Sequence, residues 1–177
     1  MIKTSVKSNV VLIGMPGCGK STAGVLLAKR LGRYFLDTDV LIQAVEGRTL
    51  REIIAEKGMD GFCDVERTHV ECVDIKNAVI ATGGSVVYYP SAMRALKAEG
   101  VIVYLSLSLA ELEKRLSDLG RRGVVIEPNQ TLSTLYEKRI PLYEQWADVT
   151  VDLSGLNHEA SVEEILKKTR GHDKPKL

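Results

Sequence analysis

The sequence predicts a three-layer α/β domain, in which helices cover both faces of a five-stranded parallel sheet. Short apolar runs alternate along the chain with segments of helical periodicity, as they do where crossover helices join parallel strands. The runs are almost continuously apolar, which is typical of strands buried on both faces. The first run also ends in a glycine-rich turn that leads directly into a helical segment.

The individual elements follow in order from this pattern. The expected strands are Val10–Ile13, Tyr34–Leu36, Ala78–Ala81, Val101–Leu105 and Val149–Val151. The expected helices span residues 20–31, 39–45, 49–57, 62–75, 91–98, 108–119, 131–146 and 159–169. Residues 119–130 contain glycine, proline and adjacent arginines without a clear period, so we expect a lid or binding loop there. The polar residues 172–177 are expected to fray, which leaves a single domain over residues 1–171.

The composition is that of an ordinary globular domain of 177 residues, with 45% hydrophobic and 27% charged residues. A net charge of +1 and the lack of a dense basic run give no reason to expect nucleic acid as a partner. No apolar stretch approaches the roughly 18 residues of a membrane span, and the polar N-terminus is unlike a signal peptide. We therefore expect a cytoplasmic monomer whose three cysteines are reduced thiols.

The glycine-rich turn matches the phosphate-loop pattern G-x-x-x-x-G-K-[ST] at residues 14–21. Its glycines allow backbone N–H groups to point at phosphate oxygens, and the next helix presents its positive end to the same anion. Lys20 is expected to reach the β- and γ-phosphates, and the Ser21 hydroxyl to hold Mg²⁺. The residues expected to bind the nucleotide here are Gly14, Gly17, Cys18, Gly19, Lys20, Ser21 and Thr22.

Two acidic residues, Asp37 and Asp39, follow the second expected strand. In an extended chain, residues two apart point the same way, so both carboxylates would face one space at the carboxyl edge of the sheet. Asp37 would anchor Mg²⁺, and Asp39 would orient or deprotonate an acceptor hydroxyl. The alternative for Asp39 is to cap the helix that follows.

Gly83 and Gly84 follow the third expected strand, where two glycines let the backbone approach a ligand closely. Arg139 falls in the same helical row as several leucines, so its guanidinium is expected to point inward. A buried guanidinium needs an anionic partner. That partner is either a carboxylate or phosphate of a ligand, or a structural ion pair such as one with Glu66.

Two further arginines lie beside the expected lid. Arg115, on the outward side of its helix, would stack on a base or touch a phosphate, or would be a solvated surface residue. Arg122, within the lid, would neutralise charge on the transferring phosphoryl group, or would belong to an exposed basic loop.

The order and spacing of these motifs resemble the shikimate kinase family across nearly the whole chain. The matching features are the phosphate loop, the FLDTD sequence at 35–39, Phe62 and Glu66 of a Phe-Arg-x-x-Glu motif, Gly83-Gly84 of a glycine triplet, Arg139-x-Pro-x-Tyr143, and Arg115 with Arg122. The resemblance implies a P-loop kinase fold and ATP with Mg²⁺ as the phosphoryl donor. It also implies catalytic roles for Lys20, Asp39 and Arg122, and an acceptor site formed by Asp39, Cys63, Gly83, Gly84 and Arg139.

Three departures from the family pattern fall where that family holds its acceptor. Cys63 replaces one of the two arginines that clamp the shikimate carboxylate, Ser85 replaces the third glycine, and the lid reads Arg-Gly-Val-Val at 122–125. A thiol cannot replace a fixed planar cation. Asp64, next to Cys63, would disfavour a carboxylate and favour an ammonium group.

The main expectation is therefore ATP-dependent phosphorylation of a hydroxyl on a small carboxylate-bearing metabolite, as in shikimate kinases. One alternative is a kinase for a hydroxy-amino acid such as homoserine. A third is a nucleotide-binding regulatory module without efficient transfer. Because the ATP-side motifs are intact, the departures bear on the acceptor and not on catalysis in general.

Overall fold

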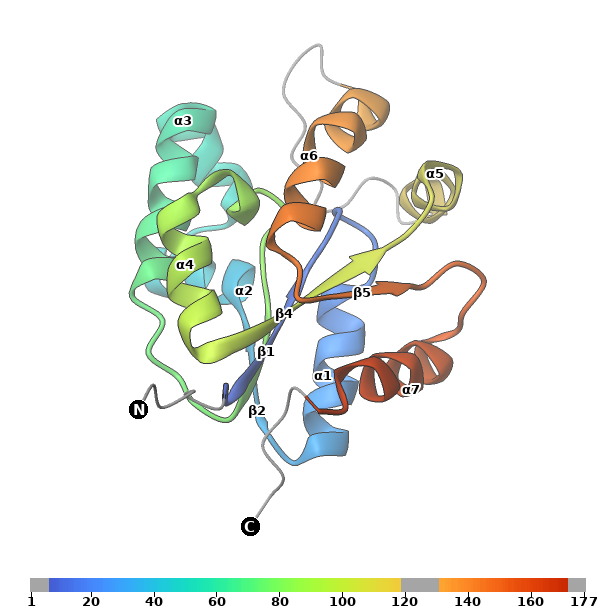
Figure 1. Cartoon of the computed structure of the whole chain (residues 1–177). Helices are drawn as coiled ribbons and strands as arrows, with labels where there is room; N and C mark the ends of the chain where they lie inside the picture. Colours follow the sequence, from blue (N-terminus) through green and yellow to red (C-terminus); the bar gives the residue numbers. More distant parts are fainter. Residues whose placement is uncertain (1–6, 119–130, 172–177) are drawn as a thin grey trace.

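A five-stranded sheet runs through the centre of the molecule in the order β2-β3-β1-β4-β5 (Figure 1). The computed structural model describes residues 7–118 and 131–171. The strands are β1 (Asn9–Ile13), β2 (Tyr34–Asp37), β3 (Ala78–Ala81), β4 (Gly100–Ser106) and β5 (Val149–Asp152). All neighbouring pairs are parallel, which confirms the predicted fold class. Because β1 is the central strand, between β3 and β4, the loop that follows it lies at the middle of the sheet's carboxyl edge.

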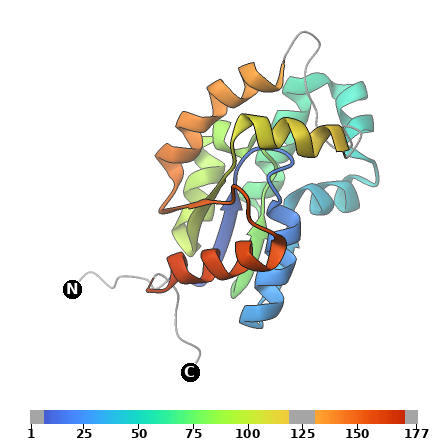
Figure 2. The same ribbon diagram turned by 90° about the vertical axis from the view of Figure 1, so that its right-hand side faces the viewer.

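Helices cover both faces of this sheet. They are α1 (Lys20–Leu31), α2 (Thr38–Glu46), α3 (Leu50–Glu71), α4 (Pro90–Glu99), α5 (Leu109–Asp118), α6 (Leu132–Trp146) and α7 (His158–Thr169), with a short 3₁₀ helix η1 (Val86–Tyr88). Helices α1 and α7 pack together on one face, and α4 covers the other face with α3 against it (Figures 1 and 2). Helices α5 and α6 lie toward the carboxyl ends of the strands (Figure 1).

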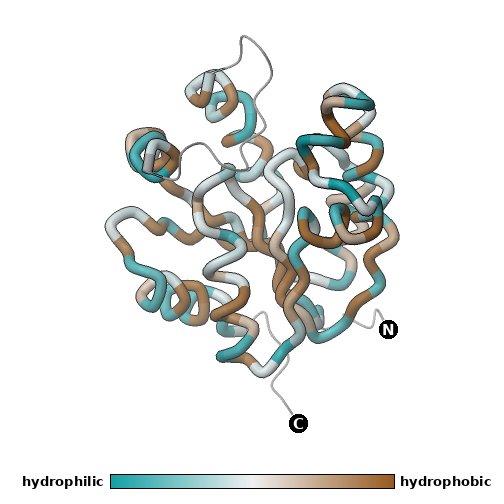
Figure 3. Tube along the Cα trace, turned by 180° about the vertical axis from the view of Figure 1, so that it is seen from behind, coloured by the Kyte–Doolittle hydropathy of each residue, from teal (hydrophilic) through white to brown (hydrophobic). Residues whose placement is uncertain are grey.

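The core consists mainly of the apolar side chains of the central strands, as the hydropathy colouring of Figure 3 shows. Every residue of β1 and β3 is buried, as expected for strands covered on both faces. A second, smaller cluster joins α2 to α3 through Ile42, Ile53 and Phe62. This cluster supports one wall of the site described below.

The predicted elements agree closely with the observed ones, with two corrections. The two helices predicted at 49–57 and 62–75 are confirmed as the two parts of α3, because non-helical backbone at Gly58 (φ 71°, ψ −178°) interrupts the element between them. A capping box between Thr49 and Glu52 fixes its start, and it ends at Glu71, four residues before the predicted end. The sequence analysis did not predict η1.

The predicted lid at 119–130, with Arg122, and the predicted frayed tail at 172–177 lie outside the described residues. Among the helices that the structure describes, none has the length and apolar character needed to cross a bilayer.

Candidate functional site

The phosphate-loop segment connects β1 to α1 at the centre of the carboxyl edge of the sheet. Gly19 caps α1 in a left-handed conformation (φ 105°) without a side-chain hydrogen bond. The N–H groups of the first helical turn are therefore available to an anion, and the helix dipole favours one there. Gly14 also has a positive φ of 147°, and a Cβ at this position would lie 2.6 Å from the Leu105 carbonyl oxygen. The backbone here thus requires glycine.

Two cations flank this loop. Lys20 is buried, and its Nζ donates to the carbonyl oxygens of Gly14 (2.8 Å) and Met15 (3.0 Å). Arg115 of α5 donates to the Cys18 carbonyl oxygen at 3.1 Å. Arg115 therefore lies against the loop rather than on the outward side of its helix, which contradicts the alternative of a solvated surface arginine; its contact with a base or phosphate stays a prediction.

Ser21 and Asp37 are joined by a hydrogen bond of 2.6 Å from Ser21 Oγ to Asp37 Oδ2. A hydroxyl and a carboxylate are hard oxygen donors, which suit Mg²⁺ when phosphates supply the remaining ligands. The second Asp37 oxygen, Oδ1, accepts hydrogen bonds from the N–H groups of Asp39 (3.0 Å) and Val40 (3.3 Å).

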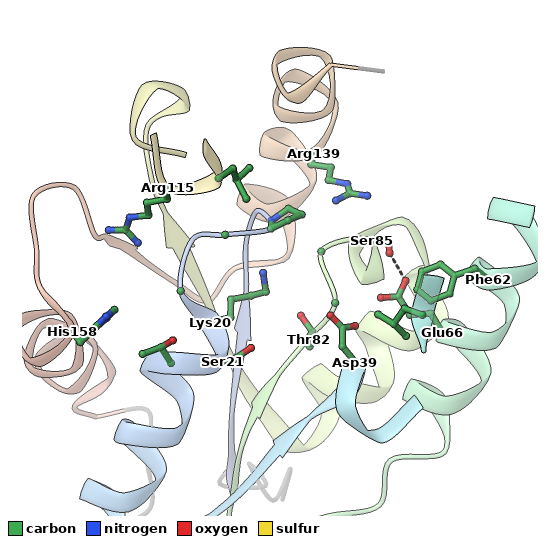
Figure 4. Close-up of a pocket in the computed structure, with 18 of the residues that line it drawn as sticks. Lys20, Ser21, Asp39, Phe62, Glu66, Thr82, Ser85, Arg115, Arg139 and His158 are labelled. Atoms are coloured by element: carbon green, nitrogen blue, oxygen red, sulfur yellow. Dashed lines mark hydrogen bonds between the residues drawn. The ribbon is translucent and has the colours of Figure 1, made fainter. Parts of the chain in front are cut away.

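The predicted geometry of the two aspartates needs a correction. Asp37 ends β2 and is the residue that caps α2, whereas Asp39 already belongs to the first turn of that helix. The two carboxylates are therefore not related as alternate residues of an extended strand, and the capping role considered for Asp39 belongs to Asp37. Asp39 lines the cavity nonetheless, because the helical turn directs its side chain there (Figure 4).

Burial raises the pKa of the Asp39 carboxyl above its usual range, and the nearby charge of Asp37 raises it further, while Lys20 acts in the opposite direction. A carboxylate with a raised pKa is a better proton acceptor. Asp39 is thus suited to the role of a general base.

Gly83 and Gly84 form the opposite wall, and both are crowded by charged side chains. A Cβ on Gly83 would clash with carboxylate oxygens of Glu66 and Asp39, and a Cβ on Gly84 would lie 2.9 Å from an Arg139 nitrogen. The Gly83 N–H donates to Thr38 Oγ1 at 3.0 Å. The absence of side chains at these two positions is what lets the three charged groups converge.

Arg139 is buried in α6, as its helical row predicted. Its Nε donates to the Tyr88 hydroxyl (3.2 Å), and its guanidinium lies over the Tyr88 ring, 5.2 Å from the centroid. Within the described part of the chain Arg139 forms no ion pair, so the structural pair with Glu66 is not found. The guanidinium lines the cavity and is available to an anionic ligand.

Glu66 is fully buried, and its Oε2 accepts a hydrogen bond from the Ser85 hydroxyl (Figure 4). Burial raises the pKa of Glu66 to about 7, although the hydrogen bond from Ser85 opposes this shift. The charge of Asp39 raises the pKa as well, whereas Arg139 and Lys20 lower it. Glu66 thus belongs electrostatically to the same site.

These groups surround a cavity of about 710 Å³ (Figure 4). The predicted residues that line it are Gly17, Gly19, Lys20, Ser21, Thr22, Asp39, Gly83, Gly84, Arg115 and Arg139. Four predicted residues do not line it, namely Gly14, Cys18, Asp37 and Cys63. The Cys18 side chain is buried in the core, and Asp37 reaches the site only through Ser21.

Two residues of α3, Cys63 and Asp64, entered the expectations about the acceptor. Cys63 is partly buried and does not line the cavity, and burial raises the pKa of its thiol, so it supplies no charge. The Asp64 side chain is 71% exposed and pairs with Arg67 at 3.0 Å. The negative charge that favoured an ammonium group therefore lies on the outer surface of α3.

The sequence analysis missed several residues that line the cavity, among them Pro16, Thr82, Leu156, Asn157 and His158. Asn157 and His158 begin α7, and only the helix-capping pattern at Asn157 could have marked their position. Arg115 and His158 lie on one side of the phosphate loop, and Arg139 lies on the other (Figure 4). The cavity therefore extends to both sides of the phosphate loop.

Comparison with known proteins assigns this arrangement to a family. A family model described as shikimate kinase matches residues 16–170. The chain belongs to the shikimate kinase family. It is therefore an ATP-dependent small-molecule kinase, and this expectation is favoured over that of a nucleotide-binding module.

Relatives with the family name cover almost the full length of the chain. The shikimate kinase of Thermodesulfovibrio yellowstonii is 39% identical over 163 residues, which are 90% of this chain and 94% of the relative. That of Persephonella marina is 34% identical and covers 92% of this chain and 99% of the relative. The structure of shikimate kinase from Acinetobacter baumannii in complex with shikimate has a TM-score of 0.81 and 32% identity, covering 91% of this chain and 92% of that one.

Proposed function

We propose that this shikimate kinase family member phosphorylates a hydroxyl of shikimate, with Mg²⁺ and ATP as the phosphoryl donor. The observation that carries the proposal is the pairing of a phosphate loop with a second polar wall. Asp39 and Arg139 lie on that wall. The Asp39 carboxylate would accept a hydrogen bond from the reacting hydroxyl, and the buried Arg139 guanidinium would pair with the acceptor's carboxylate.

The nucleotide's phosphates would lie on the phosphate loop, where Lys20 and the first-turn N–H groups of α1 offset their charge. The base would lie on the side of Arg115 and His158, where a guanidinium and an imidazole offer flat surfaces for stacking. Ser21 and Asp37 would hold Mg²⁺, which would offset negative charge on the nucleotide's phosphates.

The acceptor would bind through its carboxylate to Arg139 and through the reacting hydroxyl to Asp39. The hydroxyl oxygen forms a bond to the γ-phosphorus, the bond from that phosphorus to the bridging oxygen breaks, and ADP leaves. The hydroxyl proton passes to Asp39, whose raised pKa favours this transfer. The predicted contribution of Arg122 to this step remains part of the proposal.

The partners in this proposal are ATP, the acceptor and Mg²⁺, and the protein would work as a monomer in the cytoplasm. The Asp64 side chain is exposed and pairs with Arg67, so it gives no reason to expect an ammonium group on the acceptor.

The test is ADP release by the purified protein with Mg-ATP and a panel of shikimate, homoserine, serine and sugar acids. Shikimate is expected to give the fastest turnover. Faster release with homoserine or serine, or no stimulation by shikimate, would contradict the proposal.

A further inference from the structure

The buried guanidinium of Arg139 is held by a tyrosine that lies outside the cavity. Arg139 is 8% exposed and lines the cavity, whereas Tyr88 is 39% exposed and does not line it. The Tyr88 hydroxyl accepts a hydrogen bond from Arg139 Nε at 3.2 Å, and the guanidinium carbon lies 5.2 Å from the centre of the Tyr88 ring. A cation this close to an aromatic ring is attracted to it, and more strongly once it is removed from water. One side chain therefore fixes the guanidinium through two contacts.

The fold places Tyr88 firmly enough for this task. Tyr88 ends the short helix η1, which two buried valines anchor in the core, and its N–H donates to the Ser85 carbonyl oxygen at 3.0 Å. One turn beyond Arg139 on α6, the buried Tyr143 donates from its hydroxyl to the Gly84 carbonyl oxygen at 2.6 Å. Two contacts one helical turn apart thus join α6 to the segment 84–88.

The hydrogen bond to Tyr88 decides which guanidinium nitrogens are left for a ligand. A guanidinium has one N–H on Nε and two on each terminal nitrogen. No described residue accepts a hydrogen bond from Nη1 or Nη2 of Arg139, and Nη1 lies 2.9 Å from the point that a Cβ on Gly84 would occupy. Figure 4 shows the Arg139 side chain extending toward the part of the cavity where Ser85 and Glu66 lie. An anion there meets the two terminal nitrogens, and the edge that includes Nε is closed to it.

The orientation of Arg139 matters because few other cations reach this part of the cavity. Of the described residues that line the cavity, Arg115 and His158 lie on the other side of the phosphate loop, and Lys20 donates to the carbonyl oxygens of that loop. Burial raises the pKa of the Cys63 thiol, so this residue adds no charge. A carboxylate here depends on one correctly oriented guanidinium.

We propose that Tyr88 is a positioning residue for acceptor recognition, which holds Arg139 so that its two terminal nitrogens receive the acceptor's carboxylate end-on. A carboxylate has two oxygens at the spacing of these two donors, so the pair forms two parallel charge-assisted hydrogen bonds. A carboxamide offers only one accepting oxygen. This inference rests on the proposed function, because it takes Arg139 as the partner of the acceptor's carboxylate.

The test compares kcat/KM for shikimate with kcat/KM for its primary amide. The unmodified protein is expected to prefer the acid by about 10- to 150-fold, the range for one charge-assisted hydrogen bond. Tyr88→Phe keeps the ring but loses the hydroxyl, and it is expected to lower this preference about 2- to 10-fold. Tyr88→Leu also loses the ring and is expected to lower it by at least about twofold more.

The change should appear in KM for shikimate, with kcat within about twofold of the unmodified value, because Tyr88 does not touch the reacting groups. Tyr34→Phe and Tyr34→Leu are the matched controls, since Tyr34 is an exposed tyrosine at the start of β2, and they are expected to leave the preference unchanged. Tyr88→Phe decides the matter if Tyr88→Leu does not fold.

A second measurement repeats Tyr88→Phe in a protein that carries Arg139→Lys. Lysine has no Nε donor for the tyrosine and no fork for the carboxylate, so the substitution at Tyr88 is expected to have no further effect on the preference there. An effect of the same size in both backgrounds would show that Tyr88 does not act through Arg139 and would overturn this inference.

Shikimate turnover with an unchanged preference for the acid in both Tyr88 variants would overturn this inference and leave the proposed function standing. A lower Tm with an unchanged preference would likewise assign Tyr88 a structural role only. Faster turnover of homoserine than of shikimate, or no acceptor-stimulated ADP release by the unmodified protein, would overturn the proposed function and this inference with it.

Discussion

Replacing Glu66 by Gln is expected to make the protein more stable at alkaline pH than the unmodified chain, by an amount that depends on pH. Glu66 is buried, and its pKa is raised from 4.5 to about 7. The folded state therefore holds a proton on Glu66 over a pH range in which the unfolded state has lost it. Stability falls with rising pH wherever the folded state binds more protons.

The magnitude follows from the two pKa values. Below about pH 4.5 the carboxyl is protonated in both states and causes no loss of stability. Between 4.5 and about 7 the cost of ionising the buried group grows, and above 7 it reaches about 3 kcal/mol. Gln cannot ionise and retains an oxygen that accepts from Ser85. For a protein of this size the difference corresponds to roughly 6–12 °C in Tm.

The assay is thermal unfolding of both proteins, followed by circular dichroism at intervals from pH 4.5 to pH 8.5. The gain in Tm of Glu66→Gln over the unmodified protein should increase through this range, while Glu71→Gln, which alters an exposed carboxylate of α3, should show no such trend. A gain that is flat with pH, or that shrinks as pH rises, would refute the placement of Glu66 as a buried group with a raised pKa.

Three further substitutions and their measurements follow from the site. Lys20→Ala should lower kcat by at least about 100-fold, because it removes a preorganised cation from the phosphates, and full activity in the ADP-release assay would contradict the phosphate site. Cys63→Arg should lower KM for shikimate about 10-fold or more by restoring a second cation beside the acceptor, so unchanged or poorer kinetics would count against the clamp argument. Gly83→Ala should destabilise the fold by about 1–3 kcal/mol in chemical denaturation, since its Cβ meets Glu66 and Asp39, and wild-type stability would show that the wall is less crowded than described.

The fold could be predicted from the sequence because each of its signals is local. Apolar runs such as Val10–Ile13 and Ala78–Ala81 mark buried strands without reference to other parts of the chain. The phosphate loop was recognisable for the same reason, since its function depends on consecutive residues. The helix 62–75 was predicted too long because its cap at Cys72 is made by backbone groups, which leave no side-chain signature.

The acceptor side was harder to predict because it is assembled from distant segments. The inward direction of Arg139 followed from helical periodicity, but its contact with Tyr88 depends on how η1 meets α6. The hydrogen bond between Glu66 and Ser85 was not predicted for a similar reason, because Ser85 lies in another loop. The aspartates were misplaced because α2 begins within the FLDTD sequence, and a one-residue shift in the helix start changes where both side chains point.

The most direct test of the account is phosphorus NMR of the protein incubated with ATP, Mg²⁺ and shikimate. The account predicts a new phosphomonoester signal on shikimate that grows in equal amount with ADP and is absent from Lys20→Ala. Formation of ADP with inorganic phosphate alone, or unchanged ATP, would contradict it.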